Sequence, residues 1–146
     1  MLVRQILKTK SPELISVTPD QTVVEVLRLF RDNNIGFVVV SRSPGECLGT
    51  LSERDCCYAV AEYGIEAPTM RVADIMNRSV VTCSTQDLLP FVMSLMTDRR
   101  TRHVLVMDGD ASVGVVSIGD VVKHRLDELL RTEQALSDYI AGTPYH

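Results

Sequence analysis

One arrangement of glycine, serine and aspartate occurs twice in this chain with the same spacing. The first occurrence is Gly49, Ser52 and Asp55, and the second is Gly114, Ser117 and Asp120. Each S-x-x-D is typical of a capping box, in which the serine accepts a hydrogen bond from an early helix amide and the acid reaches back to the serine amide. Capping alone would explain either occurrence without a ligand.

The duplication, with the glycine in both copies, also favours a binding site for a nucleoside phosphate. A glycine allows close approach of a ligand or of another backbone segment. The open N-terminus of a helix attracts anions, and a carboxylate can accept hydrogen bonds from both hydroxyls of a ribose. The two roles are compatible, because a serine can cap its helix and still face a cleft.

Basic residues near these motifs could neutralise a phosphate. Arg54 lies inside the first motif, and Arg102 and His103 begin a strand of the second half. Because side chains alternate along a strand, we expect Arg102 or His103 to face the cleft, although His103 can equally be a core residue. Arg99 and Arg100 are better explained as a solvated helix end. Two or three charge-assisted bonds of about 1.5–3 kcal/mol each would support micromolar binding.

The elements that must position these residues are also repeated. The first half predicts a strand at 15–18, an amphipathic helix carrying Val23, Val26, Leu27 and Phe30 on one face, strands at 36–40 and 48–51, and a helix from Ser52. The second half predicts a strand at 80–82, a helix capped by Asp87 with Pro90 in its first turn, strands at 103–107 and 113–116 joined by an Asp108-Gly109 turn, and a helix from Ser117.

Each half therefore predicts strand, helix, strand, strand, helix, which is an α/β (α+β) fold of two βαββα repeats. One repeat of roughly 60 residues would bury little apolar area. We therefore expect the two repeats to pack face to face about a pseudo-twofold axis, with a cleft at each junction. The predicted division is a first repeat at 1–64, a linker at 65–72, a second repeat with a long C-terminal helix at 73–141, and a tail at 142–146.

Composition excludes several classes of protein. The 146 residues are 45% hydrophobic and 23% charged, as in a folded globular chain. No apolar segment approaches the roughly 20 residues that cross a bilayer, and a net charge of −4 disfavours nucleic acid as the main partner. The cysteines and histidines lack the spacing of a zinc site.

Free thiols suit a reducing compartment, so we predict a cytoplasmic protein, although the basic segment before Glu13 leaves a mitochondrial address open.

In the predicted last helix, apolar residues recur at alternating steps of four and three. They are Val122, Leu126, Leu129, Leu136 and Ile140, with Glu133 interrupting the series. Such a stripe can pack on its own chain or on a partner helix across a dimer. The sequence leaves both possibilities open.

Taken together, these features resemble a tandem pair of cystathionine β-synthase-type (CBS) domains, called a Bateman module. Besides the two glycine–serine–aspartate motifs, the resemblance is carried by Val17-Thr18-Pro19-Asp20, Asn34-Ile35-Gly36, Ala73-Asp74-Ile75-Met76 and Arg102-His103. The chain is similar to small stand-alone pairs that carry Ser-Glu-Arg-Asp, as at 52–55, and Ser-Ile-Gly-Asp-Val-Val-Lys, as at 117–123.

The resemblance implies a regulatory module rather than an enzyme, with no catalytic cofactor and no metal. It implies an adenosine nucleotide ligand (AMP, ADP, ATP or NAD), a homodimer built as a flat disc of four repeats, and a regulated partner protein. Carried over to this chain, the family's contacts assign Asp55 and Asp120 to ribose with Ser52 and Ser117 beside them, Arg54, Arg102 and His103 to phosphate, and Ser16, Val17, Val81 and Thr82 to the adenine, with Gly36 and Ile118 completing the candidate site.

The chain departs from its close relatives after the first motif. They often continue with Tyr-Ala-Arg-Lys, where this chain has Cys56-Cys57-Tyr58-Ala59. Two basic residues are lost, so we expect weaker phosphate binding at the first site. The usual Leu-Pro-Val after the histidine is Val104-Leu105-Val106, which keeps the strand apolar.

Two classes of function follow from the sequence. The first is a nucleotide-sensing regulatory module, whose ligand shifts the orientation of the two repeats and is read by a partner. The second is a constitutive dimeric scaffold with closed or empty clefts. An enzyme is a distant third, because neither a nucleophile–base–orienter set nor a Walker-type phosphate loop is visible.

Overall fold

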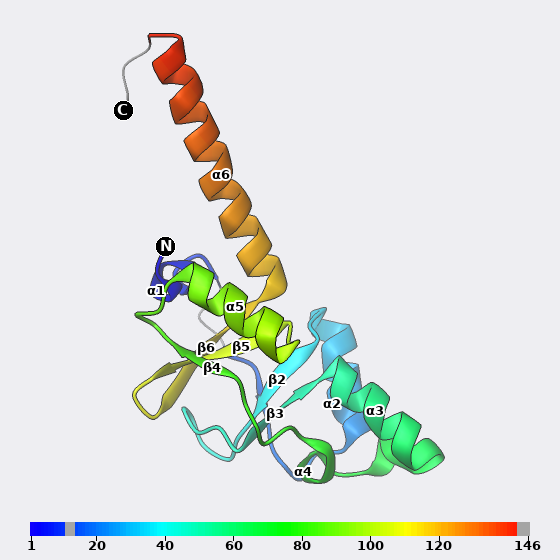
Figure 1. Ribbon diagram of the computed structural model, residues 1–146. Helices are drawn as coiled ribbons and strands as arrows, with labels where there is room; N and C mark the ends of the chain where they lie inside the picture. The colour runs from blue at the N-terminus through cyan, green and yellow to red at the C-terminus, as the bar shows by residue number, and fades with distance from the viewer. Residues whose placement is uncertain (11–13, 143–146) are drawn as a thin grey trace.

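The first repeat forms a three-stranded sheet covered by two helices (Figure 1). The computed structural model describes residues 1–10 and 14–142, so residues 11–13 and the predicted tail beyond Gly142 lie outside the described residues. Strand β2 (Phe37–Val40) lies at the centre, parallel to β1 (Ser16–Val17) and antiparallel to β3 (Gly49–Ser52). The helices are α2 (Val23–Asn33) and α3 (Glu53–Tyr63), and a 3-10 helix, η1 (Gly64–Thr69), follows α3.

The second repeat has the same order of elements. Its central strand β5 (His103–Asp108) is parallel to β4 (Thr82–Ser84) and antiparallel to β6 (Ala111–Ser117). Its helices are α5 (Leu89–Arg99) and the long α6 (Ile118–Ile140). The predicted pair of βαββα repeats with a long C-terminal helix is therefore confirmed.

Two short helices that the sequence pattern did not predict cross between the repeats. Helix α1 (Val3–Leu7) precedes the first repeat but places Val3 and Ile6 in the core of the second. Helix α4 (Val72–Ile75) precedes the second repeat but places Val72 in the core of the first. Backbone bonds fix both crossings: the Val3 amide donates to the Asp87 carbonyl at 2.9 Å, and the Val72 amide donates to the Gln21 carbonyl at 2.8 Å. Each core is thus completed by a segment that precedes the other repeat.

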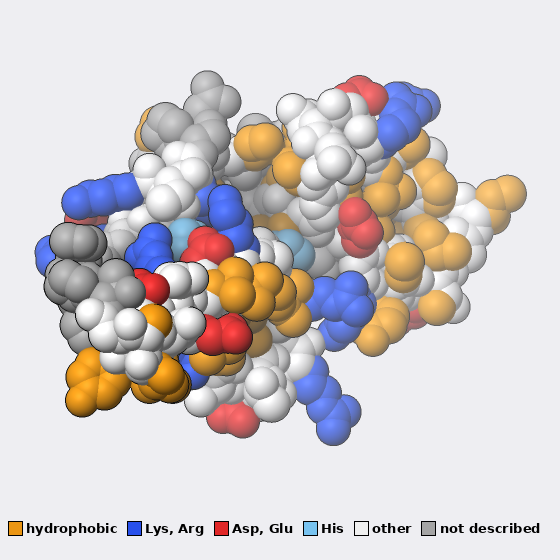
Figure 2. All heavy atoms as spheres, turned by 90° about the horizontal axis from the view of Figure 1, so that it is seen from above, with side chains coloured by type: hydrophobic (Ala, Val, Ile, Leu, Met, Phe, Trp, Pro, Cys, Tyr) orange, Lys and Arg blue, Asp and Glu red, His pale blue; other side chains and the backbone are white. Residues whose placement is uncertain are grey.

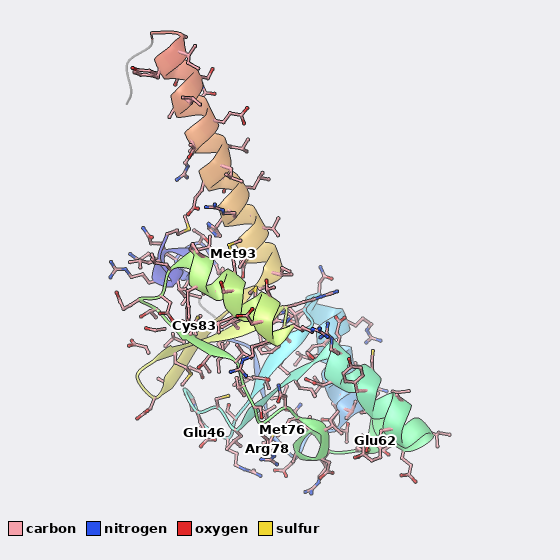
Figure 3. The ribbon with its side chains drawn as sticks, viewed as in Figure 1. Glu46, Glu62, Met76, Arg78, Cys83 and Met93 are labelled. Atoms are coloured by element: carbon pink, nitrogen blue, oxygen red, sulfur yellow. The ribbon has the colours of Figure 1, made fainter. Side chains whose placement is uncertain are left out.

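The start of α5 corrects a prediction made from the sequence. Asp87 does not cap this helix, which begins at Leu89 after Leu88. The Asp87 carboxylate instead accepts a hydrogen bond from the Ser84 amide at 2.7 Å. The Asp87 carboxylate is used in this turn and is not available to the helix, because one short side chain cannot bond the Ser84 amide and also reach the first amides of α5. Figure 3 labels Cys83 on β4 and Met93 on α5 of this repeat; Cys83 is buried in its core and Met93 packs against that core.

The outer surface mixes charges of both signs with apolar side chains. Figure 2, which looks down from above, shows Lys and Arg interspersed with Asp and Glu and several groups of hydrophobic side chains. Within the described residues, no helix combines the length and the apolar character that a membrane span requires.

Candidate functional site

Both glycine–serine–aspartate corners form complete capping boxes. In the first, the Ser52 amide donates to Asp55 Oδ2 at 2.9 Å and the Asp55 amide donates to Ser52 Oγ at 3.2 Å. In the second, the Ser117 amide donates to Asp120 Oδ2 at 2.9 Å and the Asp120 amide donates to Ser117 Oγ at 3.2 Å. The capping interpretation is therefore correct for both motifs. The backbone contact uses Oδ2 of each acid, so a second carboxylate oxygen remains at each corner for a ligand hydroxyl.

The two motif glycines make room for the segments that cross between the repeats. A Cβ atom on Gly49 would lie 2.8 Å from the Asn77 carbonyl oxygen and 3.0 Å from Met76 Sδ. A Cβ atom on Gly114 would lie 2.7 Å from Leu7 Cδ2. Met76, labelled in Figure 3, follows α4, and Leu7 ends α1. The close approach expected at these glycines is therefore made by the chain itself.

A lysine from the N-terminal segment lies on the second corner. Lys10 Nζ donates to Asp120 Oδ2 and to the Val115 carbonyl, both at 2.7 Å. Burial opposes ionisation of Asp120, but the hydrogen bonds from Lys10 and Ser117 outweigh it, so the pKa of this carboxyl lies below its usual value. The second corner is therefore a preformed ion pair at a helix N-terminus.

The second corner opens on a pocket of about 480 Å³ to which both repeats contribute. Its lining includes Lys10, Ile15, Gly36, Phe37, His103 and Ser117. The rings of Phe37 and His103 stack with their centroids 4.6 Å apart and their planes 14° apart. These residues begin β2 and β5, so the stack joins equivalent positions of the two repeats. Burial, helped by Lys10 and by Arg102, lowers the pKa of His103 despite the opposing effect of Asp120.

The structure brings part of the predicted site together in this pocket. Gly36, His103 and Ser117 line it, and Asp120 joins them through Lys10. Ser16 and Val17 instead line a separate pocket of about 470 Å³. The roles assigned to all these residues in ligand binding stay predictions.

The remaining predicted residues are dispersed. Arg54 Nη1 donates to the Arg100 carbonyl at 2.8 Å, so it spans to the other repeat beside the first corner. Arg102 is exposed, and its carbonyl accepts from the amide of Ile118, whose own side chain is largely exposed. Val81 packs against the core of the second repeat, whereas Thr82 is exposed on β4.

Sequence reasoning missed most of the lining residues, among them Lys10, Ile15 and Phe37. No sequence pattern identified Lys10, because its partner Asp120 lies 110 residues further along the chain. The two side chains meet only because α1 crosses to the second repeat. Phe37 directly follows Gly36 at the start of a predicted strand, and its equivalence to His103 in the repeat could have identified it. Over residues 1–10 and 14–142, no group of three or more His, Cys, Asp or Glu side chains is arranged to hold a metal ion.

Comparison with known proteins supports the repeat. The family model of the CBS domain matches the chain twice, at residues 3–62 and 72–127. Both matches begin at the first residue of a crossing helix, α1 or α4.

Three individual proteins illustrate the likeness. A mitochondrial CBS domain-containing protein of Arabidopsis thaliana is 34% identical over 86% of this chain, which spans only 63% of that relative's length. The crystal structure of a CBS-domain containing protein from Agrobacterium tumefaciens is 35% identical, covers 86% of this chain and 99% of its own, and superposes with a TM-score of 0.82. The cytosolic domain of the Mg²⁺ channel MgtE in complex with ATP is 34% identical, with a TM-score of 0.63, over 77% of this chain and 45% of its own.

The matches identify a domain family and not a cellular location. The location in mitochondria is a property of the Arabidopsis relative, and the cytoplasmic location of this chain stays a prediction. Both repeats match one domain family, and the same two repeats make up the fold. The chain therefore belongs to the CBS domain family, as a tandem pair of CBS domains.

Proposed function

We propose that this CBS pair is a regulatory module that binds an adenosine nucleotide in the pocket at its second corner and changes how a partner protein is bound. The observation that supports this most strongly is the ion pair with Asp120 made by Lys10, which lines a pocket of about 480 Å³. This arrangement places a cation, a carboxylate and a helix N-terminus beside an apolar pocket. The ATP complex of the MgtE cytosolic domain supports the choice of ligand class.

The charges at the second corner suit the polar parts of a nucleotide. Lys10 has three N–H donors and uses two of them on Asp120 and Val115, so one remains for a phosphate oxygen. Asp120 keeps a carboxylate oxygen for the ribose hydroxyls. Because the pKa of Asp120 is already lowered, the acid is ionised at neutral pH and ready to accept. The helix dipole of α6 adds a favourable field for the phosphate.

The apolar part of the pocket suits the base. Ile15 and Ile35 lie in the lining together with the stacked rings of Phe37 and His103. A flat adenine gains free energy by leaving water for such surfaces, and by contact with aromatic faces. Ile15, Ile35 and Phe37 of the first repeat would thus contact the base while Asp120 of the second repeat contacts the sugar, so the ligand would bridge the repeats and bias their relative orientation.

A constitutive scaffold remains the second candidate, because one observation favours it. Both motif carboxylates bond back to their own helix amides, as they would without any ligand. A titration separates the two functions. We expect AMP, ADP, ATP or NAD to raise the melting temperature of the purified protein, by the equivalent of about 2.7 kcal/mol at 100 times the dissociation constant. If none of the four nucleotides changes the melting temperature, the constitutive scaffold is favoured as the function.

Replacing Lys10 tests the role of the second corner. Lys10→Met keeps the apolar stem and removes the ammonium, and we expect the dissociation constant of the best nucleotide to rise by about tenfold, since a bond to a charged group contributes about 1.5 kcal/mol or more. Lys8→Met is the matched control, because Lys8 carries the same charge two residues away and is exposed. Isothermal titration calorimetry measures both. Equal losses in the two variants would assign the effect to net charge and would remove Lys10 from the site.

A further inference from the structure

The face of α6 that packs on its own repeat carries a buried histidine. His124 is 6% exposed and lies one helical turn after Asp120, so both side chains are on the same side of the helix. The apolar stripe of α6, from Val122 to Ile140, is exposed and lies elsewhere on the helix surface. A buried imidazole is costly unless its polar atoms find hydrogen-bond partners. The placement of His124 therefore depends on the residue that it bonds.

His124 bonds the residue that precedes Lys10. Its Nε2 atom lies 3.3 Å from Thr9 Oγ1, and the Thr9 hydroxyl donates to the Ile6 carbonyl at 2.8 Å. A hydroxyl has a single hydrogen, and Thr9 uses it on Ile6, so towards His124 the hydroxyl can only accept. Nε2 of His124 therefore carries the proton and donates it to Thr9. This bond fixes both the tautomer of the histidine and the position of Thr9.

Two consecutive residues after α1 are thus held by two residues of α6 that lie one turn apart. His124 holds Thr9, and Asp120 holds Lys10 through an ion pair of 2.7 Å. The side chains of Lys10 and Asp120 are 33% and 19% exposed. A partly exposed lysine loses many rotamers when it is held in one place, and a fixed backbone just before it reduces that loss. The bond between Thr9 and His124 supplies such a fixed point.

We propose that His124 is a positioning residue for the pocket at the second corner. Through Thr9 it holds Lys10 on Asp120, and it thereby sets the affinity of that pocket for its nucleotide. Lys10 lines the pocket and His124 does not, so the effect of the histidine passes through Thr9 and Lys10. The effect on affinity rests on the proposed function. The position of Lys10 does not, because it is a property of the free protein.

The ionisation of Asp120 reports the position of Lys10 in the absence of any nucleotide. Burial raises the pKa of this carboxyl, and the hydrogen bond from Lys10 is the largest of the effects that lower it. We therefore expect Thr9→Val and His124→Leu to raise the pKa of Asp120, in the same direction as Lys10→Met, when the side-chain carboxyl is titrated by carbon NMR. An unchanged pKa of Asp120 in both variants would overturn the proposal.

A conservative replacement separates positioning from packing. His124→Gln places an amide N–H close to the position of the imidazole Nε2, so it can still donate to Thr9 and should keep the pKa of Asp120 near that of the wild type. His124→Leu fills the space without a donor. If His124→Leu does not fold, Thr9→Val still removes the same bond, at a residue that is exposed. A pKa of Asp120 that is raised equally by His124→Gln and His124→Leu would assign the histidine a packing role only.

Val92→Ala is the matched control for lost stability. Val92 lies on α5 and is fully buried in the core of the same repeat. We expect this variant to melt at a lower temperature than the wild type, with the pKa of Asp120 unchanged. If Val92→Ala raises that pKa as much as Thr9→Val does, general destabilisation explains the effect and the positioning role is wrong.

Isothermal titration calorimetry connects the position of Lys10 to binding. We expect Thr9→Val and His124→Leu each to raise the nucleotide dissociation constant about three- to fivefold, the size of an effect passed between residues in contact. In a Lys10→Met background neither replacement should have a further effect, because both act through Lys10. Additive losses would show that His124 acts by another route and would overturn the proposal. If no nucleotide binds the wild type, the proposed function fails, while the NMR titration still decides whether His124 positions Lys10.

Discussion

The two corners of this CBS pair have the same local sequence and different surroundings. Ser52 and Asp55 form the same capping box as Ser117 and Asp120, with bond lengths that agree at 2.9 and 3.2 Å. Among the residues that the structure describes, an ammonium group reaches only the second corner, from Lys10. The duplicated motif therefore fixes where each helix starts, whereas the segment that crosses from the other repeat fixes the charge of the site.

One carbonyl position shows how the crossing segments differ. The Thr50 carbonyl in β3 accepts a backbone bond from the Asn77 amide at 2.8 Å. The Val115 carbonyl, at the same place in β6, accepts from Lys10 Nζ at 2.7 Å. A peptide group closes the first corner, whereas a flexible side chain closes the second. A side chain can move aside for a ligand at lower cost than a paired backbone segment.

Removing the two aspartates should reveal the largest difference between the corners. We expect Asp120→Ala to raise the nucleotide dissociation constant about 10- to 100-fold, as loss of one or two bonds to a charged acceptor would, and Asp55→Ala to change it less than about threefold. Both variants lose the same capping-box bond, but Asp120→Ala also loses the ion pair with Lys10 and should therefore lose more stability, so both affinities are measured at a temperature at which each variant is fully folded. Calorimetric titration measures this ranking, and equal affinities would show that the corners are functionally equivalent.

A methyl group added at the motif glycines should separate the corners by stability. We expect Gly49→Ala to lower the free energy of unfolding by about 1–3 kcal/mol, because the new Cβ meets the Asn77 carbonyl in a paired backbone segment. Gly114→Ala should cost less, because the atom it meets is the far end of the Leu7 side chain, which can rotate. Urea denaturation monitored by circular dichroism gives both values. A larger loss for Gly114→Ala would show that α1 is held more rigidly than the segment after α4.

The pH dependence of stability should show the smallest effect. The pKa of His103 is lowered in the folded chain, so the unfolded chain binds more protons between that pKa and the ordinary value near 6.5. The free energy of unfolding therefore receives the full contribution of neutral His103 above about pH 6.5, and this contribution declines as the pH falls toward the lowered pKa. His103→Phe keeps a ring against Phe37 and removes the titration. Wild type should therefore lose more stability than the variant between about pH 7.5 and pH 5.5 in urea titrations; parallel curves would contradict this.

Much of the fold could be predicted from short stretches of sequence. The apolar face of α2, the β-branched strand at β2 and the two S-x-x-D capping boxes all depend on residues within one or two turns of each other. Repetition of the same order then predicted the two packed units. The prediction failed locally at Asp87, where a turn and a helix start competed for one carboxylate.

The sequence by itself determined the repeated elements, the helix starts and the stripe on the last helix, because these depend on spacing along the chain. Only the tertiary structure decided which corner carries a cation, since Lys10 reaches Asp120 through the crossing of α1 into the second repeat. It also decided that the stripe of α6 faces solvent, because the helix packs on its own repeat through another face, where Val121 and His124 are buried. Contacts between distant segments follow from how whole surfaces fit, and no local pattern encodes that fit.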